Sequence, residues 1–166
     1  GDWSSDVCSS DLRDFTWRVT GRPWQGRLDY AGRRLRLERA PLALAGAHQG
    51  ANAAVAVALA EQLMDRFPRL NRDTVAAGLA EMRWPCRLER VLNTPPVIID
   101  VAHNVAGARR IAEILEQCVV VMAVAADKKA AAMIDMLAPR ARRLLLTEFT
   151  GARALPAEVL AEAAGN

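Results

Sequence analysis

A run of β-branched residues that ends on polar side chains is the first place in this sequence where chemistry could occur. Residues 97–101 predict a strand that places Asp100 at its carboxyl end, with His103 in the following turn and Asn104 as a candidate helix cap. Open α/β sheets bind ligands at the carboxyl ends of their strands. Asp100 could hold ribose hydroxyls or a metal-bound water, and the helix N-terminus suits an anion. The simpler interpretation is a capped turn with a surface histidine.

Two basic residues could meet an anionic substrate. Arg87 follows Pro85 in a segment that is rigid enough to aim its guanidinium, whose planar donors suit phosphate oxygens. Lys128 comes shortly after a second predicted strand, again at a carboxyl end. Trp84, close to Arg87, could cover a planar ring, although packing at a domain junction is the commoner role of such a tryptophan.

A third polar cluster opens an otherwise apolar helix. His48, Gln49 and Asn52 stand at its start, and the spacing of i and i+4 places His48 and Asn52 on one face. Polar side chains on a buried helix need partners. The cluster therefore indicates either contact with a base or ribose, or helix capping together with one internal hydrogen bond.

Several classes of site and partner find no support in the composition. The 166 residues contain no glycine-rich phosphate loop, neither G-x-x-x-x-G-K-[ST] nor G-x-G-x-x-G. The three cysteines form neither a disulfide framework nor a zinc pattern, and we assign no metal ligand in this chain. The formal net charge of +3 fits an anionic small substrate, and no nucleic-acid motif accompanies it. No apolar run could span a bilayer, and free cysteines fit the cytoplasm.

The first half of the chain predicts a hairpin followed by two helices. Residues 25–30 and 33–38 alternate around Ala31-Gly32, which indicates a β-hairpin whose arginine-rich strand is a solvated edge. Residues 48–64 predict a helix that is apolar on most faces and therefore buried. A second helix begins near Asn71 and stops before the proline at position 85.

The second half alternates strands with helices. The predicted strands are residues 97–101, 118–124 and 143–147, and the predicted helices are residues 105–116, 130–137 and 156–164. This alternation is typical of βαβ units and a parallel sheet, so the fold class is α/β. We place a domain boundary near residues 83–96, where helices give way to strands.

The first twelve residues do not resemble a structural element. Residues 1–12 match the in-frame translation of a common sequencing-library adapter, and we exclude them from the fold as an artefact. The alternative is a natural polar tail. If the segment is adapter, the chain is a piece whose own N-terminus is missing.

Four motifs occur together in one order. They are Gly46-Ala47-His48-Gln49-x-x-Asn52-Ala53-Ala54, Trp84-Pro85-x-Arg87-Leu88-Glu89, Ile99-Asp100-x-Ala102-His103-Asn104 and Asp127-Lys128. With these motifs the chain resembles the bacterial folylpolyglutamate synthase/dihydrofolate synthase family of the Mur ligases, from about Asp14 to the end. The resemblance implies that residues 13–82 are the tail of an α/β central ATPase domain. Residues 83–166 would be an incomplete, carboxy-terminal Rossmann-like glutamate-ligase domain with a mostly parallel sheet.

The resemblance also implies a reaction. In this family ATP phosphorylates a carboxylate of the folate, and the amine of L-glutamate attacks the acyl phosphate to give an amide, ADP and phosphate. By motif position, Asn52 would contact the adenine side of ATP, Arg87 its phosphates, and Asp100 its ribose. His103 would lie near the phosphates or the glutamate, and Lys128 would meet the glutamate. Arg87 and His103 would thus be the catalytic residues. The P-loop lysine and the Mg²⁺ ligands would lie upstream, so this piece alone would be inactive.

The sequence departs from the family pattern at three positions. The family usually has glycine where Cys86 stands, a small residue at Val101 and proline at Val105. A glycine at position 86 would supply backbone freedom that cysteine lacks. Two other functions stay open, a peptidoglycan Mur ligase and a non-catalytic nucleotide-binding α/β domain. Which of the two folate-ligase activities applies is also open. The family resemblance further implies a monomer.

Overall fold

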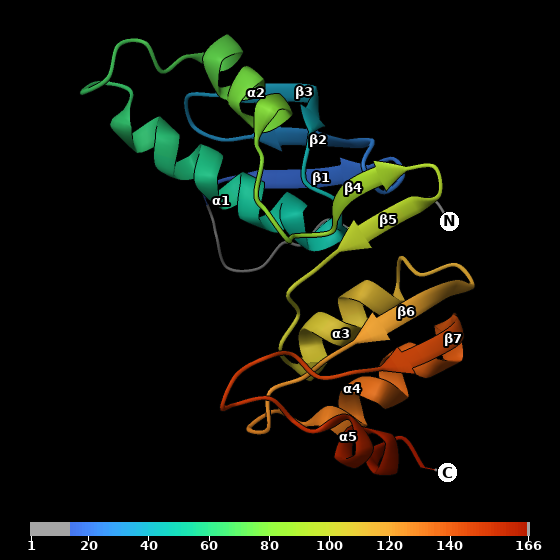
Figure 1. Cartoon of the computed structure of the whole chain (residues 1–166). Coiled ribbons are helices and arrows are strands. Elements are labelled where there is room, and N and C mark those ends of the chain that lie inside the picture. The colour runs from blue at the N-terminus through green and yellow to red at the C-terminus, as the bar shows by residue number, and fades with distance from the viewer. Residues whose placement is uncertain (1–13, 166) are drawn as a thin grey trace. The chain divides into compact units, whose positions relative to one another are not determined.

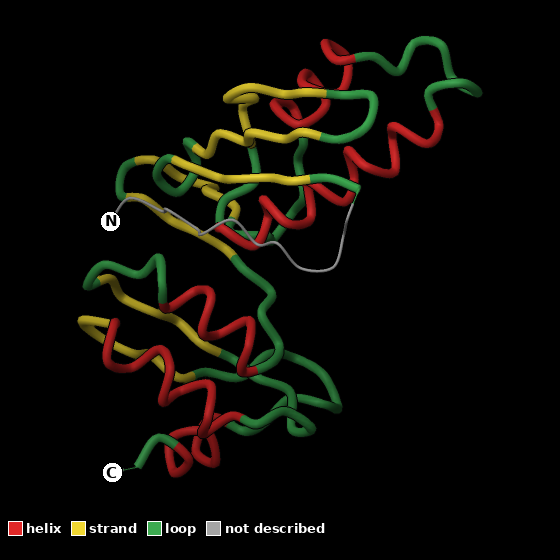
Figure 2. The backbone as a smooth tube through the Cα atoms, turned by 180° about the vertical axis from the view of Figure 1, so that it is seen from behind, coloured by secondary structure: helices red, strands yellow, loops and turns green. Residues whose placement is uncertain are grey.

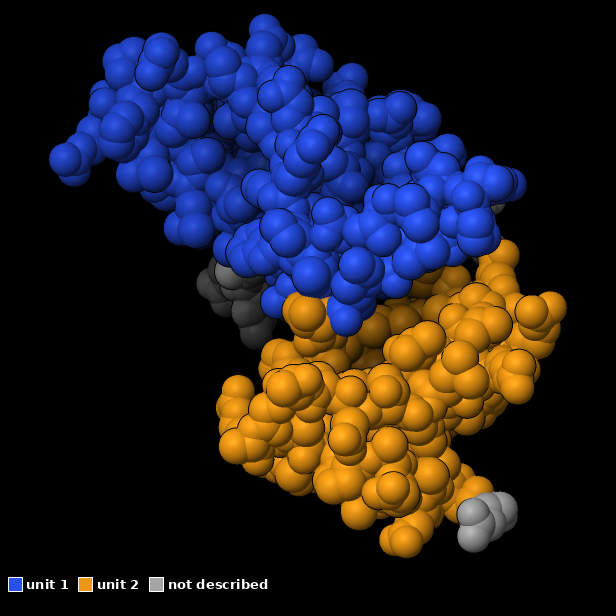
Figure 3. Space-filling view, viewed as in Figure 1, with its two compact units in different colours: residues 1–100 blue, residues 101–166 orange. Residues whose placement is uncertain are grey.

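The computed structural model describes residues 14–165 (Figure 1). The adapter-like segment 1–12 lies outside them. The chain divides between Asp100 and Val101 into two compact units, coloured separately in Figure 3. The domain boundary near residues 83–96 stays a prediction. In the part of the chain that the structure describes, no helix combines the length and apolarity needed to cross a membrane.

An antiparallel sheet begins the first unit. It contains β1 (Thr16–Thr20), β2 (Gly26–Ala31) and β3 (Arg36–Leu42), in that order. The predicted hairpin is confirmed, because Ala31 of β2 pairs with Arg36 of β3. The arginine-rich strand β3 is an edge of this sheet, as its charged sequence predicted.

Two helices cover one face of this sheet. Helix α1 (Ala47–Leu63) packs against β1, and α2 (Arg72–Glu81) packs against β3. The capping box that Asn71 forms with Thr74 starts α2 where the sequence predicted it. The core between helices and sheet is formed by buried apolar side chains: Val19, Leu28, Tyr30, Leu35, Leu37, Ala40, Leu42, Ala53, Ala54, Val57 and Leu79.

The prediction that α1, apolar on most faces, is buried holds for one side of the helix only. Ala54 and Val57 lie in the core, but Val55, Leu59 and Leu63 are 46%, 61% and 45% exposed. A helix that lies on one face of a single sheet has one covered side. The periodicity of this sequence could not show which side that is, because apolar residues occupy nearly all of them.

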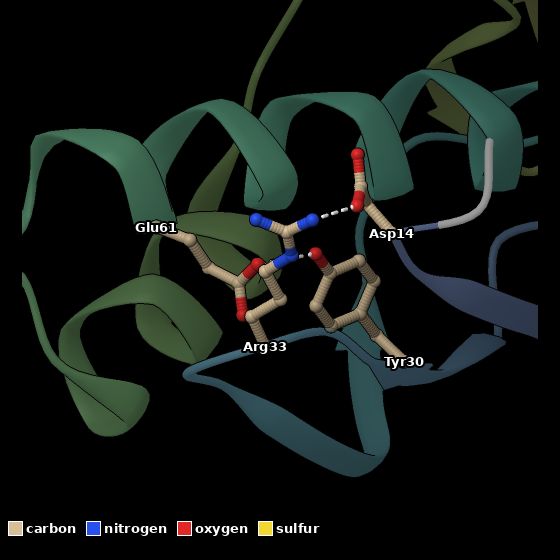
Figure 4. Close-up of polar contacts among 4 residues, drawn as sticks. All are labelled: Asp14, Tyr30, Arg33 and Glu61. Atoms are coloured by element: carbon tan, nitrogen blue, oxygen red, sulfur yellow. Dashed lines mark hydrogen bonds and ion pairs between the residues drawn. The ribbon is translucent and has the colours of Figure 1, made fainter.

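A buried carboxylate ties α1 to the β2–β3 turn. Glu61 is 3% exposed and accepts a hydrogen bond from the Tyr30 hydroxyl at 3.0 Å (Figure 4). It accepts a second from the Leu35 backbone N–H at 2.6 Å. The Arg34 backbone N–H donates a further bond at 2.9 Å. A Cβ atom on Gly32 would come within 2.5 Å of the Glu61 carboxylate, so a larger residue there would displace the carboxylate. Sequence reasoning missed this cluster.

A second hairpin closes the first unit. Strands β4 (Glu89–Asn93) and β5 (Pro96–Ile99) pair antiparallel. The sequence pattern assigned the strand at residues 97–101 to a parallel sheet, and this is wrong for the described residues. Only Thr94 and Pro95 separate the two strands, and so short a connection permits local antiparallel pairing, whereas a parallel crossover needs a dozen residues or more.

The second unit is a small α/β layer (Figure 2). Its elements are α3 (Val105–Ala112), β6 (Cys118–Met122), α4 (Ala130–Leu137), the 3₁₀ turn η1 (Ala138–Arg140), β7 (Ala141–Leu146) and α5 (Ala157–Ala163). Strands β6 and β7 are parallel and are joined through α4, which confirms the predicted α/β class. Helix α3 packs beside α4, and Ala108, Met122, Ile134 and Leu160 belong to the core of this unit.

Candidate functional site

Arg87 is presented by a strained loop between α2 and β4. Its side chain is exposed, while its two neighbours have left-handed backbones, with φ of +57° at Cys86 and +46° at Leu88. This conformation costs an L-residue about 1–2 kcal/mol. Non-glycine residues stay in it only where the surroundings fix them, and such sites cluster at functional positions. The expectation that residue 86 needs glycine-like freedom therefore has a physical basis.

Three hydrogen bonds hold the backbone of this loop. The Cys86 N–H donates to Oε2 of Glu89 at 2.9 Å, and the Leu88 N–H donates to Oδ2 of Asp100 at 2.9 Å. The indole N–H of Trp24 donates to the Leu88 carbonyl at 2.8 Å. The backbones of both residues next to Arg87, Cys86 and Leu88, are thus held by hydrogen bonds, and the Arg87 side chain extends from the loop between them.

Trp24 is a site residue that sequence reasoning missed. It lies in the β1–β2 turn with a φ of +63°, and the Arg90 guanidinium stacks over its ring at 4.7 Å. Leu88, whose carbonyl it binds, is buried. No local pattern could have indicated this contact, because Trp24 and Leu88 are 64 residues apart in the chain.

The turn after β5 has the capped form that the simpler interpretation described. Asn104 accepts a hydrogen bond from the Gly107 N–H at 2.8 Å and so caps α3 as predicted. The exposed His103 places its Nδ1 3.3 Å from the Val101 carbonyl. A Cβ on Gly107 would come within 2.9 Å of Ala102, so this turn is tightly packed.

The polar cluster at the start of α1 is a chain of side-chain contacts. Asn52 donates to Oε1 of Gln49 at 3.0 Å, and Nε2 of Gln49 lies 3.2 Å from Nε2 of His48. Gln49 is buried and Asn52 is exposed. The helix has no side-chain cap, because Gly46, at a φ of +108°, occupies the cap position against the His48 ring. The internal hydrogen bond foreseen for this cluster is present, and the cap is not.

Lys128 is paired with its own neighbour. Its ammonium donates to Oδ2 of Asp127 at 2.6 Å. This hydrogen bond, together with the charges of Lys128 and Arg153, lowers the pKa of the Asp127 carboxyl. Arg153 belongs to the loop after β7. Its backbone carbonyl accepts a hydrogen bond from the Ala126 N–H at 2.8 Å.

The structure thus brings some predicted residues together and leaves others apart. Within the first unit, Arg87 and Asp100 are joined through the Leu88 peptide, and Asn52 lies on α1. His103 and Lys128 belong to the second unit. Among residues 14–165 no group of three or more His, Cys, Asp or Glu side chains could hold a metal ion. The ligand roles of the five residues stay predictions.

Comparison with known proteins places this site in a family context. Residues 86–166 match the family described as Mur ligase, glutamate ligase domain. The chain is 38% identical over 133 residues to the dihydrofolate synthase/folylpolyglutamate synthase of Mycobacterium tuberculosis, covering 75% of this chain and 27% of that protein. It is 33% identical over 141 residues to the folylpolyglutamate synthase of Lacticaseibacillus casei, covering 80% of this chain and 33% of that protein.

A solved structure from this family has a similar fold. Mycobacterium tuberculosis folylpolyglutamate synthase complexed with ADP superimposes with a TM-score of 0.80 at 33% identity, covering 93% of this chain and 36% of that one. This chain therefore spans about a quarter to a third of the length of the curated relatives described above.

Proposed function

We propose, from the premise that residues 86–166 belong to the glutamate ligase domain family of the Mur ligases, that the polypeptide containing this chain joins L-glutamate to a folate with hydrolysis of ATP. The observation that carries the proposal is the anchored loop that presents Arg87, which lies at the start of the matched domain. Its strained, hydrogen-bonded backbone fits a residue that must meet a charged ligand in one geometry.

Arg87 has the chemistry that the proposed reaction requires. A carboxylate of the folate attacks the γ-phosphorus of ATP, which gives an acyl phosphate and ADP. The glutamate amine then attacks the acyl carbon, and the tetrahedral intermediate expels phosphate and loses a proton to leave an amide. A guanidinium binds phosphate oxygens with two parallel N–H donors and stabilises the negative charge that develops on them.

The other four residues supply binding groups in this proposal. Asn52, exposed at the start of α1, would contact the adenine side of ATP, and Asp100 its ribose. His103 and Lys128 would meet the phosphates and the glutamate. Mg²⁺ would neutralise phosphate charge when bound. The family resemblance implies that its protein ligands lie upstream of these residues.

The test is glutamate-dependent turnover by the protein encoded by the complete reading frame that contains these residues. We expect ADP release that requires both L-glutamate and either dihydropteroate or a folate. Arg87→Ala should lower kcat by about 100-fold or more, the scale seen when a charge-stabilising donor is removed. Arg69→Ala is the matched control, because Arg69 is an exposed arginine outside the site. Turnover that depends on a nucleotide-sugar peptide instead of a folate, or no turnover with any acceptor, would contradict the proposal.

A further inference from the structure

We propose that Glu89 and Asp100 are positioning residues that fix the backbone on either side of Arg87. The Glu89 carboxylate accepts a hydrogen bond from the Cys86 N–H, and the Asp100 carboxylate accepts one from the Leu88 N–H; these two residues flank Arg87. Both distances are 2.9 Å. The function of Arg87 toward phosphate rests on the proposed ligase activity, but the positioning itself rests on these contacts alone.

The backbone of this loop needs such anchors. Cys86 and Leu88 both have positive φ, a conformation that residues with a Cβ leave unless the surroundings hold them. Hydrogen bonds from backbone N–H groups to a carboxylate are stronger than those to neutral acceptors. Glu89 and Asp100 therefore supply the kind of interaction that keeps a strained segment in place.

The anchors come from different parts of the first unit. Glu89 is the first residue of β4, and Asp100 follows the end of β5, so the β4–β5 hairpin carries both carboxylates. The third anchor, the Trp24 indole on the Leu88 carbonyl, comes from the β1–β2 turn. The loop is thus held by hydrogen bonds to the hairpin and to the β1–β2 turn, on both sides of Arg87. Arginine has a long side chain, and a fixed origin reduces the conformations from which its guanidinium must reach a ligand.

Hydrogen exchange in this chain tests the positioning directly. In Glu89→Ala we expect the Cys86 amide to exchange at least 10-fold faster, and in Asp100→Ala the Leu88 amide to do so. The core amides of β2 should be unchanged in both. Glu89→Gln and Asp100→Asn keep a carbonyl oxygen as acceptor and should retain most of the protection. Glu38→Ala, which removes an exposed carboxylate on β3, is the control. Unchanged exchange at Cys86 and Leu88 in the alanine variants would overturn the proposal.

Turnover of the complete protein tests what the positioning is for. Glu89→Ala should lower kcat by about 10-fold with little change in the KM for ATP, and Glu89→Gln should restore most of it. The double variant Arg87→Ala/Glu89→Ala should be no slower than Arg87→Ala, because both changes remove the same interaction. If the double variant instead showed the product of the two single-variant losses in kcat, the positioning role would be overturned. If Arg87→Ala leaves kcat unchanged while exchange at Cys86 still rises in Glu89→Ala, the positioning stands and the ligase role of Arg87 fails.

Discussion

Replacing Glu61 should destabilise the first unit more than any exposed substitution. This side chain is 3% exposed and accepts hydrogen bonds from the Tyr30 hydroxyl and from the backbone N–H groups of Arg34 and Leu35. Glu61→Ala would leave the Tyr30 and Leu35 donors buried without this acceptor. A buried donor that loses its acceptor costs about 1–3 kcal/mol. We expect the free energy of unfolding to fall by about 4 kcal/mol in total.

Two further variants divide this effect among the partners. Glu61→Gln retains one acceptor oxygen but places an N–H₂ group against backbone donors, so about half of the loss should remain. Tyr30→Phe removes one donor and leaves the carboxylate with its two backbone partners, which should cost about 1.5–3 kcal/mol, the range for a hydrogen bond to a charged group. Glu38→Ala, on the exposed edge of the same sheet, should stay within about 0.5 kcal/mol of the parent chain.

Tryptophan fluorescence during urea unfolding measures these changes in the first unit alone. Trp17 and Trp24 both belong to this unit, and the sequence has no tryptophan after residue 84. The midpoint and the slope of each transition give the free energy of unfolding. A loss below about 1 kcal/mol in Glu61→Ala would refute the reasoning, since the buried donors would then have found other acceptors.

Three further predictions concern pH, the strained loop and activity. Burial, then the hydrogen bond to Glu61 and the charge of Glu61, raise the pKa of Tyr30 above the ordinary value of 10.0. The unfolded chain therefore loses this proton first, and the first unit should lose stability as the pH rises above about 10. Tyr30→Phe should remove this pH dependence of the free energy of unfolding in urea titrations. Cys86→Gly should raise the stability by about 0.5–1 kcal/mol, because relief of the left-handed strain exceeds the added chain entropy, and a lowered urea midpoint would show that the strain is absent. The present chain, which contains no P-loop, should release no phosphate from ATP when glutamate and folate are added; phosphate release that depends on both would contradict this.

The sequence predicted the elements whose signals are local. The Asn71 cap marked the start of α2, the Ala31-Gly32 turn marked a hairpin, and helix α4 spans the predicted residues 130–137. These signals depend on neighbouring residues, which the chain order already supplies.

Contacts between distant segments could not be predicted in this way. The Glu61 carboxylate meets the β2–β3 turn 26 residues earlier in the chain at Leu35, and no periodicity marks that pairing. Strand β5 pairs with β4 instead of joining a parallel sheet, because the partner of a strand is decided by the connection as well as by the apolar pattern. In the candidate site, the sequence identified Arg87 and Asp100 separately, but not the Leu88 peptide that joins them.

That peptide changes how variants of Asp100 must be interpreted. Asp100 was predicted to bind a ribose, and its Oδ2 accepts the Leu88 N–H beside Arg87. An Asp100→Ala variant would therefore remove a ligand contact and release the arginine loop at the same time, so its loss of turnover could not be assigned to either. Glu89 holds the other side of the same loop and has no predicted contact with any ligand. A fall in kcat in Glu89→Ala, with the KM for ATP unchanged, would measure how much of the function of Arg87 depends on the backbone that carries it.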